Sequence, residues 1–244
     1  MRDLAIIIPS RLAAARLPNK PLMKIKDKEM ILHVHQTAIR SDVGEVYVAS
    51  ADEQILNLIK KNGGNAIKTK INHETGTDRV YEAYEKFLKK NYEIIINLQG
   101  DMPNLNPDSI KSFASYIKNS NCDIGTLAGK FEDDVSFKNV NNVKVVTEQN
   151  ISEGKFSKAV DFFRVNENNI IDNIYHHIGI YSFRRSALIK YVNLKRSKLE
   201  ISRKLEQMRA LENNMKIEVG FIKDVPLSID TEEDLVKIKK LMNN

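Results

Sequence analysis

The 244-residue sequence has a single cysteine, no tryptophan, and only six prolines and ten glycines. The one cysteine, Cys122, cannot form an internal disulfide or, by itself, a zinc cluster. So little proline and glycine excludes a collagen-like or linker-like chain. No apolar run approaches the ~18 residues needed to span a membrane, and the apolar stretch at the start is broken by Pro9, which makes it too short for a signal peptide. These absences predict a cytoplasmic globular protein.

The charge is only mildly unbalanced: 38 Lys and Arg stand against 32 Asp and Glu, a net charge of +6. A basic balance fits a nucleic-acid partner, a phosphorylated small molecule, or simply a lysine-rich composition. Nucleic-acid binding requires a continuous basic face with aromatic side chains on which bases stack. The aromatic residues here lie mostly within apolar segments, so nucleic acid is the weaker alternative.

The first half of the chain alternates short apolar runs with amphipathic stretches. The patterns predict strands over 4–8, 45–50, 66–70 and 93–98, and helices over 28–40, 52–61, 77–90 and 107–117. Strands that alternate with helices favour an α/β fold with a mostly parallel central sheet and helices on both faces. Ligands bind beyond the carboxyl ends of such strands. The tripeptides expected at that edge are Pro9-Ser10-Arg11, Ser50-Ala51-Asp52 and Gln99-Gly100-Asp101.

The stretch from about 130 to 200 is less regular. Short β-like pieces over 143–147, 159–165 and 178–183 alternate with polar loops, and further helices are predicted over 198–212 and 231–242, around a strand over 216–219. We interpret the stretch as an excursion that lines a second substrate or contacts a second subunit. No repeat or linker is visible, so one domain over 1–244 is expected.

Several common motifs are absent. There is no G-x-G-x-x-G for a dinucleotide and no G-x-S-x-G for a serine hydrolase. Residues 125–130 are one residue short of a phosphate-binding P-loop. The five histidines do not form a zinc pattern with the cysteine.

The loop after the first strand is the most informative motif. Residues 9–24 carry Arg11, Arg16, Lys20 and Lys24 and no acidic residue. Arginine grips phosphate oxygens in pairs and lysine adds a point charge. Such a loop at the ligand edge suits a triphosphate, and the alternative is a solvated basic loop.

A second candidate is Asp101, directly after a buried strand. Mg²⁺ typically takes one or two protein carboxylates together with phosphates and waters. A second carboxylate could come from Asp230, although Asp230 and Thr231 also fit the start of a helix. Together with the basic loop, these carboxylates would make a metal-dependent nucleotidyl or phosphoryl transfer site.

Three further groups have both a functional and a structural interpretation. The pair His176 and His177 precedes an apolar strand, where core packing is the alternative to catalysis. Glu206 and Gln207 lie in a predicted helix, where they also fit an ordinary polar face. Arg164 could bind a carboxylate or extend its head from a strand into water.

Six motifs occur in order along the chain: IIIPSRLAAARLPNKPL (6–22), ETGTDRVYEA (74–83), INLQGDMP (96–103), HHIGIYSFR (176–184), LEQMRALE (205–212) and SIDTEEDL (228–235). With them the sequence resembles the 3-deoxy-manno-octulosonate cytidylyltransferases, or CMP-Kdo synthetases, along nearly its whole length. The resemblance implies a nucleotide-diphospho-sugar transferase fold and a homodimer. It also implies Mg²⁺-dependent formation of CMP-Kdo and pyrophosphate from CTP and the eight-carbon acid sugar Kdo, for lipopolysaccharide synthesis.

The resemblance also implies roles for residues that match these motifs. Lys20, Arg11 and Asp101 are the expected catalytic residues. The nucleotide is expected to contact Arg11, Arg16, Lys20, Gly76, Thr77 and Arg79. Asp101 and Asp230 match the magnesium carboxylates. The expected sugar-site residues are Gln99, Arg164, His177, Tyr181, Glu206 and Gln207. No dedicated protein base is required.

Some positions depart from the usual family pattern. Ala14 and Ala15 stand where hydroxyl residues are common, Met102 where glutamate is usual, and Asp161 where an aromatic is typical. The last change leaves open another acid sugar, an amino-Kdo or a sialic acid. A catalytically inactive homologue that only binds nucleotide is a further alternative, which the presence of both aspartates disfavours.

Overall fold

A computed structural model describes residues 3–13, 16–88, 92–165 and 172–243. The chain divides into two compact units: unit 1 is Met1–Lys111 with Pro226–Asn244, and unit 2 is Ser112–Val225. The excursion expected at about 130–200 falls inside unit 2. Ala14 and Ala15 lie outside the described residues. No helix in the described part of the chain is both long and apolar enough to cross a membrane.

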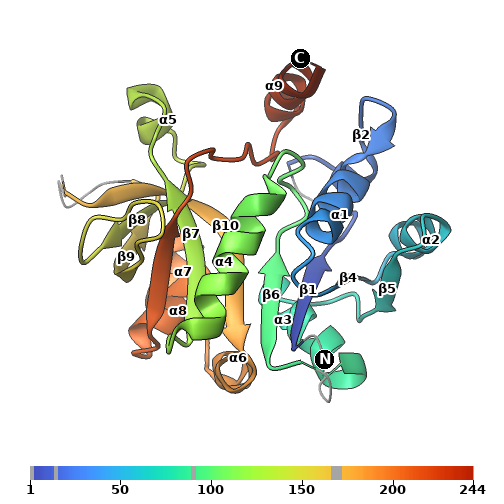
Figure 1. The fold of residues 1–244 in the computed structure, drawn as a ribbon. Coiled ribbons are helices and arrows are strands. Elements are labelled where there is room, and N and C mark those ends of the chain that lie inside the picture. The colour runs from blue at the N-terminus through green and yellow to red at the C-terminus, as the bar shows by residue number, and fades with distance from the viewer. Residues whose placement is uncertain (1–2, 14–15, 89–91, 166–171, 244) are drawn as a thin grey trace. The chain divides into compact units, whose positions relative to one another are not determined.

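Unit 1 contains four parallel strands, labelled in Figure 1: β1 (Leu4–Pro9), β4 (Glu45–Ser50), β5 (Asn65–Lys68) and β6 (Ile94–Leu98). Their order is β5-β4-β1-β6. In β1 every residue is buried, and Ile6 lies beside Val46 on one side and Ile96 on the other. A continuous apolar run is what a strand covered on both faces requires.

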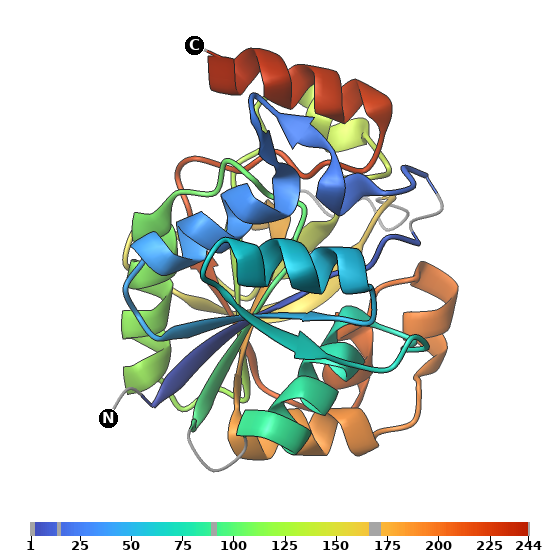
Figure 2. The ribbon, with the colours of Figure 1, turned by 90° about the vertical axis from the view of Figure 1, so that its right-hand side faces the viewer.

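The helices of unit 1 cover both faces of this sheet. Right-handed crossovers put α1 (Met30–Arg40) and α2 (Glu53–Lys61) on one face and α3 (Gly76–Ala83) on the other, as Figure 2 shows. A π-helical turn, Tyr84–Leu88, continues α3. A short 3₁₀ turn (Lys20–Leu22) and the hairpin of β2 (Lys24–Ile25) and β3 (Lys28–Glu29) lead into α1. Helix α4 (Pro107–Asn119) begins in unit 1, and α9 (Glu232–Asn243) ends it.

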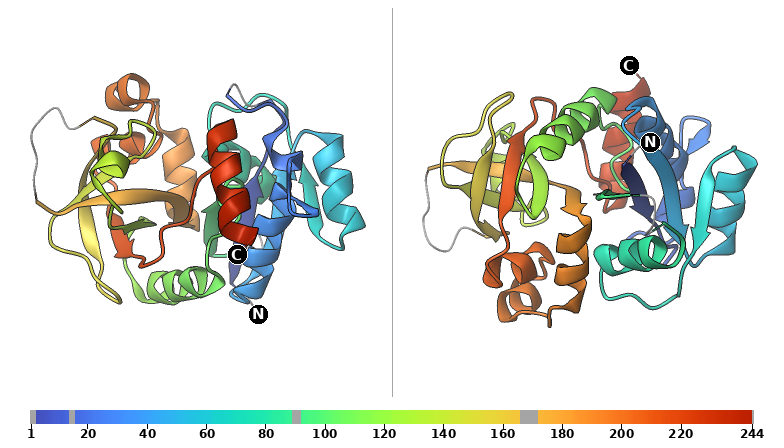
Figure 3. Two further views of the ribbon diagram at one scale, coloured as in Figure 1. Left: turned by 90° about the horizontal axis from the view of Figure 1, so that it is seen from above. Right: turned by 60° about the horizontal axis from the view of Figure 1, so that its bottom comes forward.

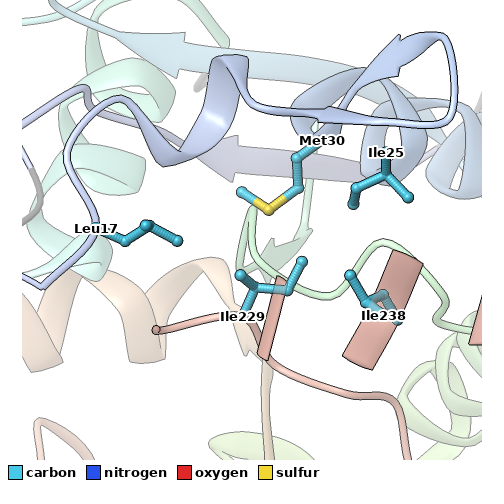
Figure 4. Close-up of a cluster of buried hydrophobic side chains, with 5 residues drawn as sticks. All are labelled: Leu17, Ile25, Met30, Ile229 and Ile238. Carbon is cyan, nitrogen blue, oxygen red and sulfur yellow. The ribbon is translucent and has the colours of Figure 1, made fainter. Parts of the chain in front are cut away.

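A small apolar cluster joins two stretches of unit 1 that are far apart in the sequence, residues 17–30 and 229–238. Figure 4 shows its five buried side chains, Leu17, Ile25, Met30, Ile229 and Ile238, pointing toward one another. Burying one such side chain stabilises by roughly 1.5–3 kcal/mol. Leu17 lies between Arg16 and Lys20, and Ile229 directly precedes Asp230. The cluster therefore brings the basic loop to the second carboxylate.

Unit 2 is built on five strands: β7 (Ile124–Gly129), β8 (Lys144–Thr147), β9 (Ser157–Phe163), β10 (Ile174–Arg184) and β11 (Ile217–Phe221). They pair in the order β10-β7-β11-β9-β8, and β8 pairs again with β10, so the pairing closes on itself. Strands β7 and β11 are parallel and the other pairs are antiparallel. The helices of this unit are α5 (Asp134–Lys138), α6 (Arg185–Asn193), α7 (Lys198–Arg203) and α8 (Gln207–Glu212). Figure 3 shows α6, α7 and α8 grouped beside the strands.

The structure confirms the α/β class and, in unit 1, the parallel sheet. It differs from the elements predicted from the sequence at several places. Residues 28–29 form a strand and not the start of a helix. The helix predicted over 198–212 is interrupted at Lys204, which has a φ of 55°. Strand β7 and helix α6 were not predicted.

Candidate active site

A pocket of about 370 Å³ opens in unit 1 beyond the carboxyl ends of β1 and β6. This is the edge at which a parallel sheet binds ligands. Four segments and Asp230 supply its lining: Pro9, Ser10 and Arg11; Arg16, Leu17, Lys20 and Pro21; His73, Thr75, Gly76 and Arg79; and Gln99, Gly100 and Asp101. Most of the predicted nucleotide and metal residues thus share one cavity.

Lys20 connects the two predicted metal carboxylates. Its Nζ atom lies 3.2 Å from Asp101 Oδ2 and 3.3 Å from Asp230 Oδ1, and it donates to the carbonyl of Ile229 at 2.6 Å. Arg16 Nη2 lies 3.0 Å from the other oxygen of Asp230. Two cations and two carboxylates therefore balance one another in the lining of the pocket.

Asp230 reaches this site through packing around its neighbours. The backbone N–H of Ile229 donates to the carbonyl of Asp101 at 3.0 Å, and the Ile229 side chain is buried in the apolar cluster. Asp234 accepts hydrogen bonds from Asp230 N, Thr231 N and Thr231 Oγ1, which caps the start of α9. The helix-start interpretation of this motif is therefore confirmed, with Asp234 as the capping carboxylate. The carboxylate of Asp230 is not the cap and faces Lys20.

Arg79 is almost fully buried beside the pocket. Its guanidinium donates to Thr69 Oγ1 at 2.6 Å and to the carbonyls of Lys70 and Ile71 at 2.9 and 3.1 Å. Burial lowers the pKa of Arg79, and the nearby charge of Arg11 lowers it further. Arg79 thus fixes the backbone of residues 69–71.

The start of α3 is ordered around Thr75 and Gly76. Thr75 and Asp78 form a capping box, a pattern that satisfies free N–H groups at a helix start. A Cβ at Gly76 would lie 3.3 Å from Gln99 Nε2, so the absence of a side chain lets the two segments approach. Thr77, predicted to bind nucleotide, is buried and accepts from Asn97 Nδ2 at 3.1 Å in place of lining the pocket.

The sequence did not single out the pair His73 and Glu82. His73 lines the pocket, and its Nε2 lies 2.6 Å from Glu82 Oε2. Glu82 also accepts from Lys70 N and Lys86 Nζ. Burial would raise the pKa of Glu82, but these hydrogen bonds together lower it to about 2. The spacing of His73 and Glu82 along the chain carries no signal for this contact, which depends on the path of the loop before α3.

Asp52 was predicted only as part of a sheet edge. Its Oδ2 accepts from the backbone N–H of Leu12 at 2.9 Å. Asp52 therefore holds the beginning of the basic loop beside the start of α2.

Five of the predicted sugar residues lie in unit 2, while Gln99 lies in unit 1. Tyr181 donates to Gln207 Oε1 at 3.2 Å, and the His177 and Tyr181 ring centres are 5.5 Å apart. Burial raises the pKa of Tyr181 well above its usual value, with Glu206 adding to the effect and Arg164 opposing it. Arg164 Nη1 donates to the carbonyls of Val140 and Asn141. Within this unit, Tyr181 therefore contacts His177 and Gln207, while the charges of Glu206 and Arg164 influence its pKa.

Two of the departures from the family pattern have structural explanations. Met102 is buried, at 2% exposure. Asp161 pairs with Arg203, whose Nη1 also donates to the carbonyl of Phe162 at 2.7 Å. Asp161 thus ties β9 to the end of α7.

Comparisons with known proteins agree with this fold. The cytidylyltransferase family profile matches residues 5–217. A 3-deoxy-manno-octulosonate cytidylyltransferase of Bartonella henselae is 39% identical over 238 residues, covering 97% of each chain. The same enzyme of Rickettsia felis is 42% identical over 245 residues, covering 100% of this chain and 96% of its own. A solved structure of CMP:2-keto-3-deoxy-manno-octonic acid synthetase complexed with CTP has a TM-score of 0.87 at 31% identity and covers 98% of both chains.

The class defined by this fold and profile is that of the cytidylyltransferases, which are nucleotidyltransferases. Within that class, the chain belongs to the 3-deoxy-manno-octulosonate cytidylyltransferase family. The family resemblance predicted from the six motifs is therefore confirmed.

Proposed function

We propose that this chain transfers CMP from CTP to the anomeric hydroxyl of 3-deoxy-D-manno-octulosonate (Kdo), releasing pyrophosphate, in lipopolysaccharide biosynthesis. The observation that carries the proposal is the meeting of the basic loop with Asp101 and Asp230 in one pocket. Relatives that share at least 39% identity and carry this enzyme name support the choice of substrates.

The nucleotide is assigned to the pocket of unit 1. Arg11 and Lys20 hold the triphosphate with support from Arg16, because guanidinium forks and ammonium groups both match phosphate oxygens. Cytidine is held by Arg79 and the start of α3, at Gly76 and Thr77. The role of Thr77 is indirect, since its hydroxyl accepts from Asn97, whose Oδ1 accepts from Gln99 Nε2 at 3.3 Å.

Kdo is assigned to the polar residues predicted for the sugar. Arg164 pairs with the carboxylate of Kdo, as a guanidinium does with a planar anion. Hydrogen bonds to the sugar hydroxyls come from four residues of unit 2, His177, Tyr181, Glu206 and Gln207.

The pocket suits Mg²⁺ on the chemistry of its donors. Asp101, Asp230 and the Ile229 carbonyl surround the Lys20 ammonium with oxygen atoms, the ligand type that Mg²⁺ takes. Among the described residues there is no group of three or more His, Cys, Asp and Glu for a metal, and two carboxylates with substrate phosphates suffice for Mg²⁺. Asp101 and Asp230 would hold the ion, which lowers the pKa of a bound hydroxyl and shields phosphate charge.

In the reaction, the anomeric oxygen of Kdo forms a bond to the α-phosphorus of CTP. The bond from that phosphorus to the bridging oxygen of the β-phosphate breaks, and the hydroxyl proton leaves to solvent. Lys20 and Arg11 compensate the negative charge that develops on the phosphates. Such electrostatic stabilisation is usually the largest contribution to the rate enhancement of phosphoryl transfer. Asp101 would act by holding the cation, and no protein base is assigned.

The direct test is pyrophosphate release by the purified full chain with CTP, Mg²⁺ and Kdo, compared with the same reaction lacking Kdo. We expect release that depends on Kdo, and its loss in the variant Asp101→Asn. Release with an amino-Kdo or a sialic acid, but not with Kdo, would move the assignment to that sugar. CTP binding without release for any sugar would identify an inactive homologue and refute the proposal.

The proposal extends to a homodimer in the cytoplasm, which the family resemblance implies. Sedimentation at several protein concentrations tests the dimer. A monomer at all concentrations would reject that part and leave the reaction unaffected.

A further inference from the structure

Thr126 lies in the middle of β7, fully buried, and its hydroxyl has three polar neighbours. Oγ1 is 2.8 Å from the carbonyl oxygen of Ile180, 2.9 Å from His177 Nε2 and 3.3 Å from the carbonyl oxygen of Ile178. A hydroxyl group has one proton to donate and two lone pairs to accept with. The three contacts therefore restrict where each proton can be.

The hydroxyl of Thr126 donates its hydrogen bond to the carbonyl oxygen of Ile180. That oxygen is the nearest neighbour, it can only accept, and two oxygens at 2.8 Å without a proton between them would repel. Thr126 Oγ1 must then accept from His177, so the imidazole carries its proton on Nε2. Burial lowers the pKa of His177 to about 3, with the charges of His176 and Arg164 adding to the effect, so the ring is neutral and has only that one N–H.

This arrangement leaves Nδ1 of His177 with a free lone pair. Within the described part of the chain, Nδ1 makes no hydrogen bond. The edge-on ring of Phe162, centred 5.2 Å away, and the tilted ring of Tyr181, centred 5.5 Å away, limit how the imidazole can turn. The nitrogen is therefore a fixed acceptor.

The same hydroxyl also holds the backbone that carries Tyr181. Thr126 is the partner of Tyr181 in the β7–β10 ladder, and the register of that ladder shifts between Ile178 and Tyr181. Tyr181 donates to Gln207 Oε1. Gln207 Nε2 is buried and has no partner among the described residues. The unit therefore presents one fixed acceptor, on a ring 5.5 Å from that of Tyr181, and one unused donor, on the amide that Tyr181 contacts.

We propose that Thr126 is a positioning residue of the acid-sugar site, which keeps His177 in the Nε2–H form so that Nδ1 accepts a hydrogen bond from a sugar hydroxyl while Gln207 Nε2 donates to a sugar oxygen. The proposal rests on the proposed function, because it takes the sugar site from there. Thr126 itself makes no contact with the sugar. An acceptor nitrogen favours a ligand with a hydroxyl at that point over an analogue that lacks it.

The first test is the ¹⁵N NMR spectrum of the full chain labelled in its histidines. The chain has five histidines, and the signals that disappear in the variant His177→Gln are those of residue 177. We expect an unprotonated Nδ1 and a protonated Nε2 for His177 in the wild type and in Thr126→Ser. Thr126→Val removes the hydroxyl at nearly the same volume. In this variant we expect a mixture of the Nδ1–H and Nε2–H tautomers of His177. A wild-type His177 with its proton on Nδ1 overturns the proposal, even if Thr126→Val fails to fold.

The second test separates this proposal from the proposed function. On addition of Kdo, the wild-type Nδ1 signal should shift as it accepts a hydrogen bond. Thr126→Val should raise KM for Kdo by about tenfold, the effect of about one lost hydrogen bond. KM for CTP should stay within about twofold of the wild type, and Thr126→Ser should restore KM for Kdo. Turnover of Kdo with no shift at Nδ1 overturns the proposal, whereas the absence of turnover refutes the proposed function and leaves the tautomer to be decided by the spectrum alone.

Discussion

At the scale of single residues, Lys20 holds together the carboxylates of Asp101 and Asp230 in the pocket. Asp101 and Asp230 would repel each other if both faced the same space without a cation. The ammonium of Lys20 contacts both and also binds the carbonyl of Ile229. Its side chain is 14% exposed, so a bound triphosphate can reach it from the pocket. Under the proposed function, one side chain therefore serves the carboxylates before substrate binds and the phosphates afterwards.

We expect Lys20→Ala to lower kcat/KM for CTP by about 100-fold or more, the usual effect of losing one group that stabilises developing charge. Pyrophosphate release at varied CTP measures it. The matched control is Lys24→Ala, which removes an exposed lysine of β2 from the same basic segment. Lys24→Ala should stay close to the wild type, and a Lys20→Ala enzyme within threefold of the wild type would contradict the assigned role.

Glu82 should stabilise the loop before α3 in a pH-dependent way. Its pKa in the folded chain, about 2, lies below the unfolded value of about 4.3, so its contribution is present above pH ~4.3 and is lost as the pH falls toward 2. We expect Glu82→Gln to lower the free energy of unfolding by ~1–3 kcal/mol at pH 7, because it disturbs three hydrogen bonds. The difference from the wild type should shrink below pH 4.

Urea unfolding at pH 7 and pH 3.5 would measure this difference. Glu53→Gln is the control, since Glu53 pairs with Lys68 on the surface and should change stability little. An equal effect of Glu82→Gln at both pH values would show that the hydrogen bonds of Glu82 do not depend on its charge.

At the scale of elements, the strands and helices that the sequence predicted well are those with a strong apolar period. Strand β4 occupies the predicted range 45–50, and α2 begins one residue inside its predicted range. Strand β7 was missed because it contains Gly125, Ala128 and Gly129, residue types that are depleted in strands. A Cβ at Gly125 would lie 2.2 Å from Ile117 Cδ1, so packing of α4 explains the small residue. Such a packing requirement cannot be derived from local pattern.

The interruption between α7 and α8 leads to a prediction about stability. Lys204 ends α7 in the left-handed conformation with a φ of 55° and a ψ of 45°, and it is exposed. A non-glycine residue there is strained by roughly 1–2 kcal/mol. Lys204→Gly should therefore raise the free energy of unfolding by up to ~1 kcal/mol, because glycine adopts this conformation without a clash.

Thermal unfolding of Lys204→Gly beside Ser202→Gly would test that explanation. Ser202 lies within α7, where glycine should destabilise by ~0.5–1 kcal/mol. Destabilisation by both glycines would mean that the left-handed turn at residue 204 is not a source of strain.

At the scale of the whole molecule, the sequence could predict which strand ends form the pocket of unit 1. It could not predict contacts between residues that are far apart in the chain. Arg11 and Asp101 follow buried strands, and parallel strands bring such residues to one edge. Asp230 follows no strand of that sheet, and it joins the site because Ile229 packs against Leu17 and Met30 in the apolar cluster. The contacts of His177 with Thr126 depend on a shift of register in β10. Long-range packing and strand register are set by the whole fold and leave no local signature.

Buried neutral histidines should make the whole molecule less stable on mild acidification. Burial lowers the pKa of His176 to about 4 and that of His177 to about 3, with nearby positive charges adding to both effects. Unfolded histidines bind protons below about pH 6.5, while these two stay neutral in the folded state. The unfolded state therefore binds more protons, and the free energy of unfolding decreases as the pH is lowered. Each group contributes a slope of up to ~1.4 kcal/mol per pH unit between pH 6.5 and its folded pKa.

Between pH 6.5 and 5 this effect is separate from that of Glu82, which begins below pH ~4.3. The chain has no tryptophan, so far-UV circular dichroism in urea is a suitable measurement at pH 7.5, 6 and 5. We expect the urea midpoint to fall over this range, and to fall less steeply in His177→Gln, which has one buried titratable ring fewer. The comparison uses slopes, so a constant loss of stability in the variant does not affect it. If both proteins lose stability equally between pH 6 and 5, His177 gains its proton without unfolding, and the acceptor nitrogen inferred for the sugar site would be protonated in the same range.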